Sequence, residues 1–288
     1  MTLLHQLDSP LMRRALLEAV LVGALCGAVG VHVILRRLPF FTVALSHATF
    51  PGVVLASIGG VSLYVGGAAA ALLLVVAVAV VGSARRLDDA TATGVALSGA
   101  FAIGVMLQST RADAAKDLAA FLVGDVFTVR AGDVAVTVAV GIAVVLLLTM
   151  LHKELVFGGF DPSGAAAAGY RTRTLDLVVL GIVAMTVVTS IQAVGTILVV
   201  ALIVTPALAA RLWVSRVAPM MALAAALGAL AGVAGIAASA QWGIAGGAAV
   251  ALAASALLGL SIVARWALDV VTRPARPSLG ADLSLGAA

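Results

Sequence analysis

The sequence predicts an all-α polytopic membrane protein, built as a bundle of eight to nine transmembrane helices. Of its 288 residues 63% are hydrophobic and 10% are charged, and the mean hydropathy is +1.20. Apolar runs long enough to cross a bilayer, about 20 residues each, fill most of the chain. The basic residues gather in the short segments between these runs. Soluble domains do not have this composition, so we predict a single membrane domain.

The first apolar run, Ala15–Leu35, is too long for the core of a signal peptide and lacks a convincing cleavage site, so we interpret it as a span. Residues 1–14 then form an N-terminal tail and residues 15–267 the transmembrane domain. Residues 268–288, rich in Pro, Gly and Ser, are predicted to be a disordered tail. The predicted spans are residues 15–35, 40–58, 63–82, 93–109, 132–151, 175–192, 194–212, 217–239 and 243–265.

The distribution of Lys and Arg predicts the orientation. Twelve of the 17 basic residues fall on one side of the predicted bundle, which is cytoplasmic by the positive-inside rule. The N-terminus is then outside and the C-terminal tail is cytoplasmic. The pI near 10.0 has the same origin and does not indicate nucleic-acid binding. The basic residues on the outer side are Arg13, Arg14, Arg111, Lys116 and Arg130.

The second predicted span carries polar chemistry into the membrane. His47 lies in the apolar stretch Leu35–Ala56, and an ionisable side chain at membrane depth by default marks a substrate or ion pathway. Pro51 deprives the His47 carbonyl of its helical donor, and Pro206 in the seventh predicted span does the same to Leu202. We predict helix breaks lining a pathway at both prolines. A hydrogen bond from His47 to a neighbouring helix is the structural alternative.

Glycine pairs at four-residue spacing allow helices to approach closely. They serve either packing within the chain or a dimer face. The pairs are Gly23/Gly27, Gly228/Gly232 and Gly243/Gly247. The single cysteine, Cys26, lies within a predicted span and excludes an internal disulfide.

Two segments between spans are too long for simple turns. The outer one, Ser109–Phe127, carries aspartates that either attract cations to an outer mouth or form the solvated side of a surface helix. In the inner one, His152–Asp176, Asp161 is a predicted N-cap with Pro162 at the first helical position. A short Ala-rich helix follows and ends at Gly169. A capped helix of small residues on the cytoplasmic side suits docking into a partner's groove.

Four segments, in order, resemble the integral membrane permeases of the zinc/manganese/iron class of ABC importers. The resemblance covers Leu16 to about Ile262. It implies eight or nine helices per subunit and a permease dimer, either a homodimer or a pair with a second permease, in the bacterial inner membrane. It also implies two cytoplasmic ATPase subunits and an extracytoplasmic metal-binding protein as partners. The segments are VILRRLPFFTVALSHATFPGV at 33–53, DLAAFLVGDVF at 117–127, KELVFGGFDPSGAAAAG at 153–169 and QAVGTILVVALIVTPALAARL at 192–212.

The resemblance gives the inner helix a role, because residues of about 160–170 are similar to the family's coupling helix, which seats on the ATPase. The chain has no GxxxxGK[ST] phosphate-binding loop. ATP hydrolysis is therefore expected from the partner, and the chain itself is predicted not to be an enzyme. The residues of the expected ATPase contact are Phe160, Asp161, Pro162, Ala165 and Gly169.

Val43 departs from the family's pattern, in which an aspartate usually precedes the histidine by four residues. His47 is then the predicted metal ligand, with Thr42, Ser46 and Thr49 nearby. Zinc accepts nitrogen ligands readily, whereas manganese prefers oxygen, so the loss of the carboxylate favours zinc. Alternatively, two copies of His47 converge at a homodimer axis, or the path binds the ion only weakly.

We therefore expect the permease subunit of an ABC importer that moves a divalent transition metal, zinc in preference, into the cytoplasm by ATP-driven alternating access. No permanently bound cofactor is expected. The alternatives are manganese or a metal chelate as cargo, and a regulatory membrane subunit that has lost transport. An intramembrane enzyme fits poorly, because Ser46 and His47 point in different directions on a helix and no HExxH motif occurs.

Overall fold

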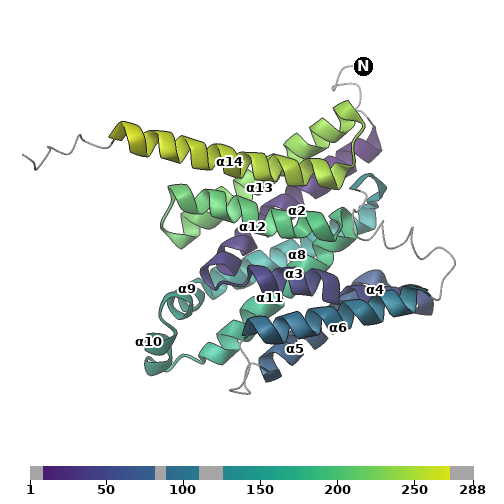
Figure 1. The fold of residues 1–288 in the computed structure, drawn as a ribbon, viewed down its shortest axis with the longest axis horizontal. Helices are drawn as coiled ribbons and strands as arrows, with labels where there is room; N and C mark the ends of the chain where they lie inside the picture. Colours follow the sequence, from purple (N-terminus) through teal and green to yellow (C-terminus); the bar gives the residue numbers. More distant parts are fainter. Residues whose placement is uncertain (1–8, 82–88, 110–125, 273–288) are drawn as a thin grey trace, which may run out of the picture.

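The computed structural model describes residues 9–81, 89–109 and 126–272, and this part of the chain is helical, with no strand (Figure 1). Short elements lie between the long helices: η1 (Val126–Thr128), α9 (His152–Phe160) and α10 (Pro162–Ala167). The elements that correspond to the predicted spans are α2 (Pro10–Leu35), α3 (Pro39–Ala48) with α4 (Phe50–Gly59), α5 (Leu63–Val81), α6 (Asp89–Ser109), α8 (Ala131–Met150), α11 (Thr172–Val194), α12 (Thr196–Trp213), α13 (Val217–Trp242) and α14 (Gly246–Thr272).

Length and composition support a membrane bundle. Among the described residues, seven helical segments are long and apolar enough to cross a membrane, with α3 and α4 taken together as one of them. Two further apolar helices are shorter, Thr93–Ser109 within α6 and Leu198–Trp213 within α12. The predicted all-α polytopic class is confirmed.

The first and last helices extend beyond the predicted membrane domain. The Ser9 hydroxyl accepts a hydrogen bond from the Met12 amide at 3.2 Å, and Pro10 occupies the first turn, so α2 begins before residue 15. At the other end α14 continues to Thr272 rather than giving way to a tail at residue 268. Arg265 and Asp269, one turn apart and 3.5 Å from each other, stabilise this extension. Caps and ion pairs set these ends, whereas hydropathy sets only the membrane-embedded part.

The glycine pairs of α2 and α13 face each other inside the chain. A Cβ added at Gly23 would overlap the carbonyl group of Gly228, and one added at Gly27 would overlap the carbonyl group of Ala224. Backbones can approach this closely only where side chains are missing. Of the two alternatives for these glycines, the structure shows packing within the chain. Gly243 has a different role, since it ends α13 in the left-handed conformation at φ 65°.

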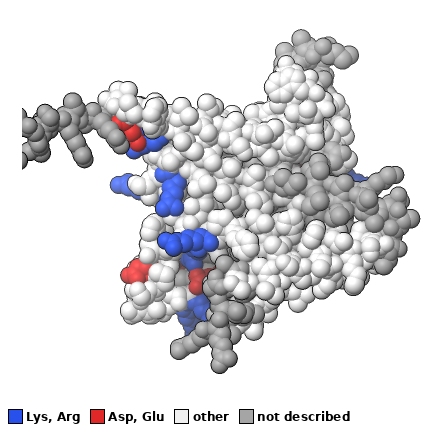
Figure 2. Space-filling view, in the orientation of Figure 1, with Lys and Arg blue, Asp and Glu red and all other residues white. Residues whose placement is uncertain are grey.

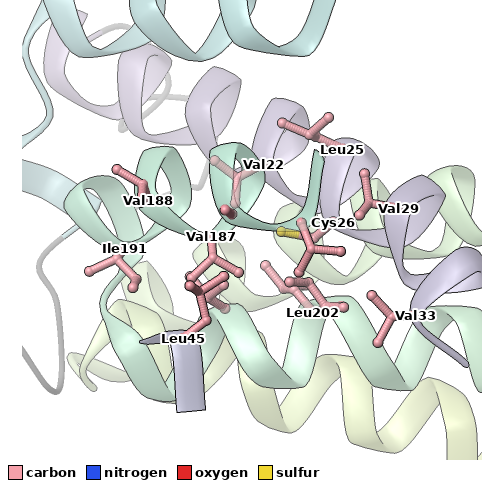
Figure 3. Close-up of a cluster of buried hydrophobic side chains, with 14 of the residues drawn as sticks. Val22, Leu25, Cys26, Val29, Val33, Leu45, Val187, Val188, Ile191 and Leu202 are labelled. Atoms are coloured by element: carbon pink, nitrogen blue, oxygen red, sulfur yellow. The ribbon is translucent and has the colours of Figure 1, made fainter. Parts of the chain in front are cut away.

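The centre of the bundle is a set of small aliphatic side chains around α2 (Figure 3). Within it the Cys26 thiol and the Ser190 hydroxyl of α11 lie 3.4 Å apart and are both buried. Helices α11, α12 and α13 all pack against α2, and α3 closes the same cluster. The cluster includes Val22, Cys26, Val29 and Val33 of α2, Leu45 of α3, Val187, Val188 and Ile191 of α11, and Leu202 of α12.

Basic side chains gather at one end of the bundle (Figure 2). This is the end that carries α9, α10 and the last turns of α14, and it lies opposite the start of α2 (Figure 1). The clustering matches the predicted single basic side, while the orientation in the membrane stays a prediction. The described basic residues at the helix ends on this side are Arg36, Arg37, Lys153, Arg171, Arg173, Arg211, Arg216 and Arg265.

We expect Gly23→Val to destabilise the bundle, because the new side chain has to displace the backbone of α13. Overpacking of this kind costs about 1–3 kcal/mol of unfolding free energy. Unfolding of the purified protein in detergent, followed by circular dichroism, would measure the difference.

Gly141→Val is the matched control, since a Cβ at Gly141 in α8 has no neighbour within 4 Å among the described residues. Equal unfolding midpoints for the two variants would contradict the close contact between α2 and α13.

Candidate functional site

The second span has a local irregularity just before Pro51, where Thr49 separates α3 from α4 but keeps helical backbone angles, φ −72° and ψ −21°. Helix α3 ends at Ala48, and α4 begins at Phe50 with Pro51 in its first turn. The amide of Thr49 still donates to the Leu45 carbonyl at 3.1 Å, but Pro51 has no amide to offer the carbonyl of His47. The irregularity therefore lies within one turn of His47.

Neighbouring helices close tightly on this irregularity. A Cβ at Gly104 of α6 would lie 3.1 Å from the Pro51 nitrogen, and one at Gly52 of α4 would overlap the Gly66 carbonyl of α5. Beside the contact, α4, α5 and α6 enclose a groove of about 610 Å³ lined almost wholly by apolar side chains. The groove offers no ligand, so any polar chemistry at the irregularity has to come from α3.

His47 is half-buried and rests edge-on against an aromatic ring of α6. The centroids of His47 and Phe101 are 5.4 Å apart with an interplanar angle of 75°, and Phe101 also contacts Phe50 at 5.9 Å. The His47 Nδ1 is buried and has no hydrogen-bond partner among the described residues. The expected alternative, a hydrogen bond to a neighbouring helix, is therefore not formed by this nitrogen within the described chain. One imidazole nitrogen stays available to a ligand.

The hydroxyl groups around His47 are engaged with their own helix. Thr42 donates to the Leu38 carbonyl at 3.2 Å, Ser46 to Val43 at 2.8 Å, and Thr49 to Ser46 at 2.9 Å. Such bonds satisfy a buried hydroxyl locally. Val43 itself contributes no polar group. His47 thus supplies the imidazole of this turn without a second strong ligand from α3.

No group of three or more His, Cys, Asp and Glu side chains occurs in the described part of the chain. A structural zinc centre takes four such ligands and a catalytic one takes three. The arrangement at His47 therefore suits a transient contact with an ion more than a resident metal. The aspartates of the outer segment, Asp113, Asp117 and Asp125, lie outside the described residues.

Pro206 does not break its helix, contrary to the prediction. Helix α12 continues through this buried proline from Thr196 to Trp213. The Thr205 hydroxyl donates to the Ala201 carbonyl at 2.7 Å. On the packed side, Gly30 of α2 brings its backbone directly against the α12 backbone. The carbonyl that Pro206 leaves without its helical donor is that of Leu202, and α12 packs on both α2 and α14.

The segment between α9 and α10 is built as its sequence predicts. Asp161 is the N-cap, and its carboxylate accepts hydrogen bonds from the Gly164 amide at 2.8 Å and the Ser163 hydroxyl at 2.7 Å. Pro162 takes the first turn, and Gly169 follows α10 at φ 88°. Ala165 is buried on the inner face of the turn. The result is a short, capped helix at the edge of the bundle (Figure 1).

Phe160 gives this segment an apolar tip. Its side chain is 64% exposed although it lies outside the helices long enough to span a membrane. Phe157 and Tyr170 pack edge-to-face at 6.0 Å on either side of α10.

Arg36, which follows the last residue of α2, links α2 to both α9 and α11. Its guanidinium pairs with Asp176 of α11, and its Nη2 donates to the Leu155 carbonyl of α9 at 3.2 Å. The Arg36 side chain is 9% exposed, whereas that of Asp176 is 60% exposed. An exposed pair contributes about 0–1 kcal/mol, so its main effect is to fix geometry. The sequence shows Arg36 in the RR pair, but not that Asp176, 140 residues away, is its partner.

Comparison with known proteins finds a match that covers the whole predicted membrane domain except its last two residues. A profile of the ABC 3 transport family matches residues 8–265. The chain belongs to the ABC-3 transport family. The predicted relation to permeases of zinc/manganese/iron ABC importers is therefore confirmed.

Relatives within the ABC-3 family are similar along nearly the full chain. A manganese transport system membrane protein MntC of Halalkalibacterium halodurans is 32% identical over 95% of this chain and 94% of its own. A zinc transport system membrane protein TroC of Treponema pallidum is 31% identical over 80% of each chain. A chain of PsaBC from Streptococcus pneumoniae, solved in complex with Fab, superposes with a TM-score of 0.83 at 31% identity, over 90% of this chain and 94% of that one.

The capping of α10 predicts a specific pH dependence. Hydrogen bonds from the Gly164 amide and the Ser163 hydroxyl lower the pKa of Asp161 below its ordinary value. Because the folded pKa is the lower one, the cap is at full strength above the unfolded value of about 3.9 and is lost as pH falls through the folded value. We expect α10 amides to keep constant protection from hydrogen exchange, corrected for intrinsic rates, between neutral pH and about pH 4.

Asp161→Asn keeps a neutral cap acceptor, so its α10 protection should not change with pH over this range. Asp161→Ala should be less protected at every pH. Exchange measured by mass spectrometry on the full chain would test both, and wild-type protection in the alanine variant would show that the cap is dispensable.

Proposed function

We propose that this chain is the membrane permease subunit of an ABC importer that moves a divalent transition metal into the cytoplasm by ATP-driven alternating access. The observation that carries the proposal is His47, half-buried in a membrane-length helix and with Nδ1 unpartnered among the described residues. An ionisable side chain within a membrane span by default marks a substrate or ion path. Membership of the family and relatives named as transport proteins support the same function.

The assembly would contain two permeases, two cytoplasmic ATPase subunits and an extracytoplasmic metal-binding protein, in a bacterial inner membrane. The second permease is a copy of this chain or a paired subunit. Phe160, exposed at the end of the bundle where basic residues gather, supports docking of an ATPase there. The same gathering supports a cytoplasmic C-terminus.

Two observations bear on the metal and favour different ions. A lone imidazole without a carboxylate at Val43 favours zinc on ligand chemistry. Several similar relatives are named for manganese, and a more distant one for zinc. Transport needs weak binding, and weak binding leaves little room for selection by ligand type alone. The proposal therefore names a divalent transition metal, with zinc and manganese as the two arms of the test.

Coupling to ATP would run through α9. Movement of α10 with a docked ATPase would displace α9. The Leu155 carbonyl of α9 accepts a hydrogen bond from Arg36 at the end of α2, so the displacement would reach α2. Arg36 is also paired with Asp176 at the start of α11. Helix α10 is in this way connected to the two helices that pack against each other in the centre of the bundle.

The deciding experiment is uptake of radioactive zinc and manganese by vesicles that contain the chain with its ATPase and binding protein. His47→Ala should reduce uptake by roughly 10-fold or more, the scale of disturbing a metal ligand's surroundings. His152→Ala at the start of α9 is the control, and its uptake should match the wild type.

Uptake unchanged by His47→Ala, with the complex assembled, would move the ion path elsewhere. Uptake of neither metal by the wild type would reject a divalent-metal importer. The ratio of zinc to manganese uptake in the wild type decides which cargo is preferred.

Asp161→Ala should weaken metal-stimulated ATP hydrolysis several-fold without preventing membrane insertion. The rigid cap holds α10 in the shape that docks, and the variant loosens it. Asp161→Asn, which retains a cap acceptor, should restore most of the stimulation. Full stimulation in the alanine variant would separate α10 from coupling.

A further inference from the structure

Glu18 is a fully buried carboxyl group in the first half of an apolar helix. It lies nine residues after Ser9, the N-cap of α2, with 0% of its surface exposed. A charged or carboxylic side chain at this depth is costly, and such residues in membrane proteins mark ion pathways or have partners. Nothing in the function proposed above uses this residue.

A small group of oxygen atoms surrounds Glu18 at the starts of α5 and α8. The Thr137 hydroxyl donates to Glu18 Oε1 at 2.5 Å, and Thr137 is 2% exposed. Asp133, one turn earlier on α8, is close enough for its charge to act on Glu18. The Tyr64 hydroxyl donates to Asp133 Oδ1 at 2.9 Å, and the Arg130 amide donates to Oδ2 at 2.8 Å.

The second oxygen of Glu18 has no partner. Glu18 Oε2 is buried, and no described residue donates to it or accepts from it. No Lys or Arg of the described residues forms an ion pair with either Glu18 or Asp133. An ionised Glu18 accepts from Thr137 at Oε1, and a protonated one can donate to the Thr137 hydroxyl oxygen. In either form Oε2 is left without a partner among the described residues, and a buried polar atom left unsatisfied is costly.

A bound cation would give the unpartnered oxygen a partner and would also supply the positive charge that these carboxylates lack. It would bind the free Oε2 and balance the two neighbouring carboxylates, whose charges otherwise repel each other. The Tyr64 and Thr137 oxygens keep lone pairs for the same ion. All four groups lie near the starts of α2, α5 and α8, at the end of the bundle opposite α9 and α10.

We propose that Glu18 and Asp133, with the Tyr64 and Thr137 hydroxyls, form an oxygen-ligand site for a divalent cation at the N-terminal end of α2. This is the end at which the predicted orientation would receive ions from outside. The site is distinct from His47, which lies on α3. It deepens the proposed function as an entry site for the transported cation, and in that respect it rests on that function.

The ligand set points to an ion that prefers oxygen. Carboxylates and hydroxyls suit Mn²⁺, whereas Zn²⁺ is drawn to imidazole and thiolate. Two carboxylates match a charge of +2 and disfavour a monovalent ion by leaving net negative charge buried. Mn²⁺ is thus the probe of choice, and its paramagnetism reports binding directly.

The test is titration of the purified full-length chain in nanodiscs with Mn²⁺, following the free ion by its electron paramagnetic resonance spectrum. The wild type should bind Mn²⁺ at a site that Glu18→Gln weakens by roughly 10-fold or more. Thr137→Val, which removes the donor that orients the carboxylate, should weaken it less.

Glu154→Gln is the matched control. Glu154 on α9 also has a buried Oε2 without a partner among the described residues, but it lies at the opposite end of the bundle. Its variant should bind Mn²⁺ as the wild type does. Unfolding midpoints measured without metal would show that Glu18→Gln is folded, as expected for an isosteric change that still accepts from Thr137.

Wild-type binding in Glu18→Gln, or no Mn²⁺ bound by the wild type, would overturn the proposal. The binding measurement needs neither ATP nor partners, so it fails independently of transport. A Glu18-dependent site in a chain whose complex takes up no metal would instead reject the proposed function and leave the site in place.

Discussion

The architecture depends on how closely α2 can approach its neighbours. Where Gly23, Gly27 and Gly30 face α13 and α12, helix backbones touch without intervening side chains. In lipid no hydrophobic gain distinguishes helix–helix from helix–lipid contact, so close packing of this kind supplies much of the association energy. Because three helices are fixed against α2, the groups that α2 carries are fixed with it.

Two of those groups stand at opposite ends of the same helix. Glu18 lies near its start, and Arg36 follows its last residue and holds α9 and α11. A helix packed this tightly moves as a unit, since packed interfaces switch between discrete arrangements rather than deform. A displacement of α9 by a docked ATPase would therefore be felt at Glu18, about 18 residues or 27 Å along the helix axis. His47 lies on a different helix, α3, and does not share this direct connection.

Local patterns were enough to predict the local features. Apolar runs gave the spans, Pro51 the irregularity beside His47, and Asp161 with Pro162 the capped α10. Features that depend on distant partners were not predictable. Pro206 has the same sequence signal as Pro51, but its helix is continuous from Thr196 to Trp213. Glu18 is visible as a carboxylate in an apolar run, yet only the fold shows that Thr137 is its partner and that Oε2 has none.

If the proposed ligands are divided between Glu18 and His47, the described residues need no single strong metal site, and none is found among them. A single centre with three or four ligands would hold a transition metal too tightly for release. In the proposed path, oxygen ligands around Glu18 and one imidazole at His47 would each bind an ion through few contacts, so that neither site would hold it too tightly for release. The loss of a carboxylate at Val43 fits this division, because the carboxylates of the path then lie at its entrance. Selection between oxygen-preferring and nitrogen-preferring ions would follow from the order in which the two sites are met.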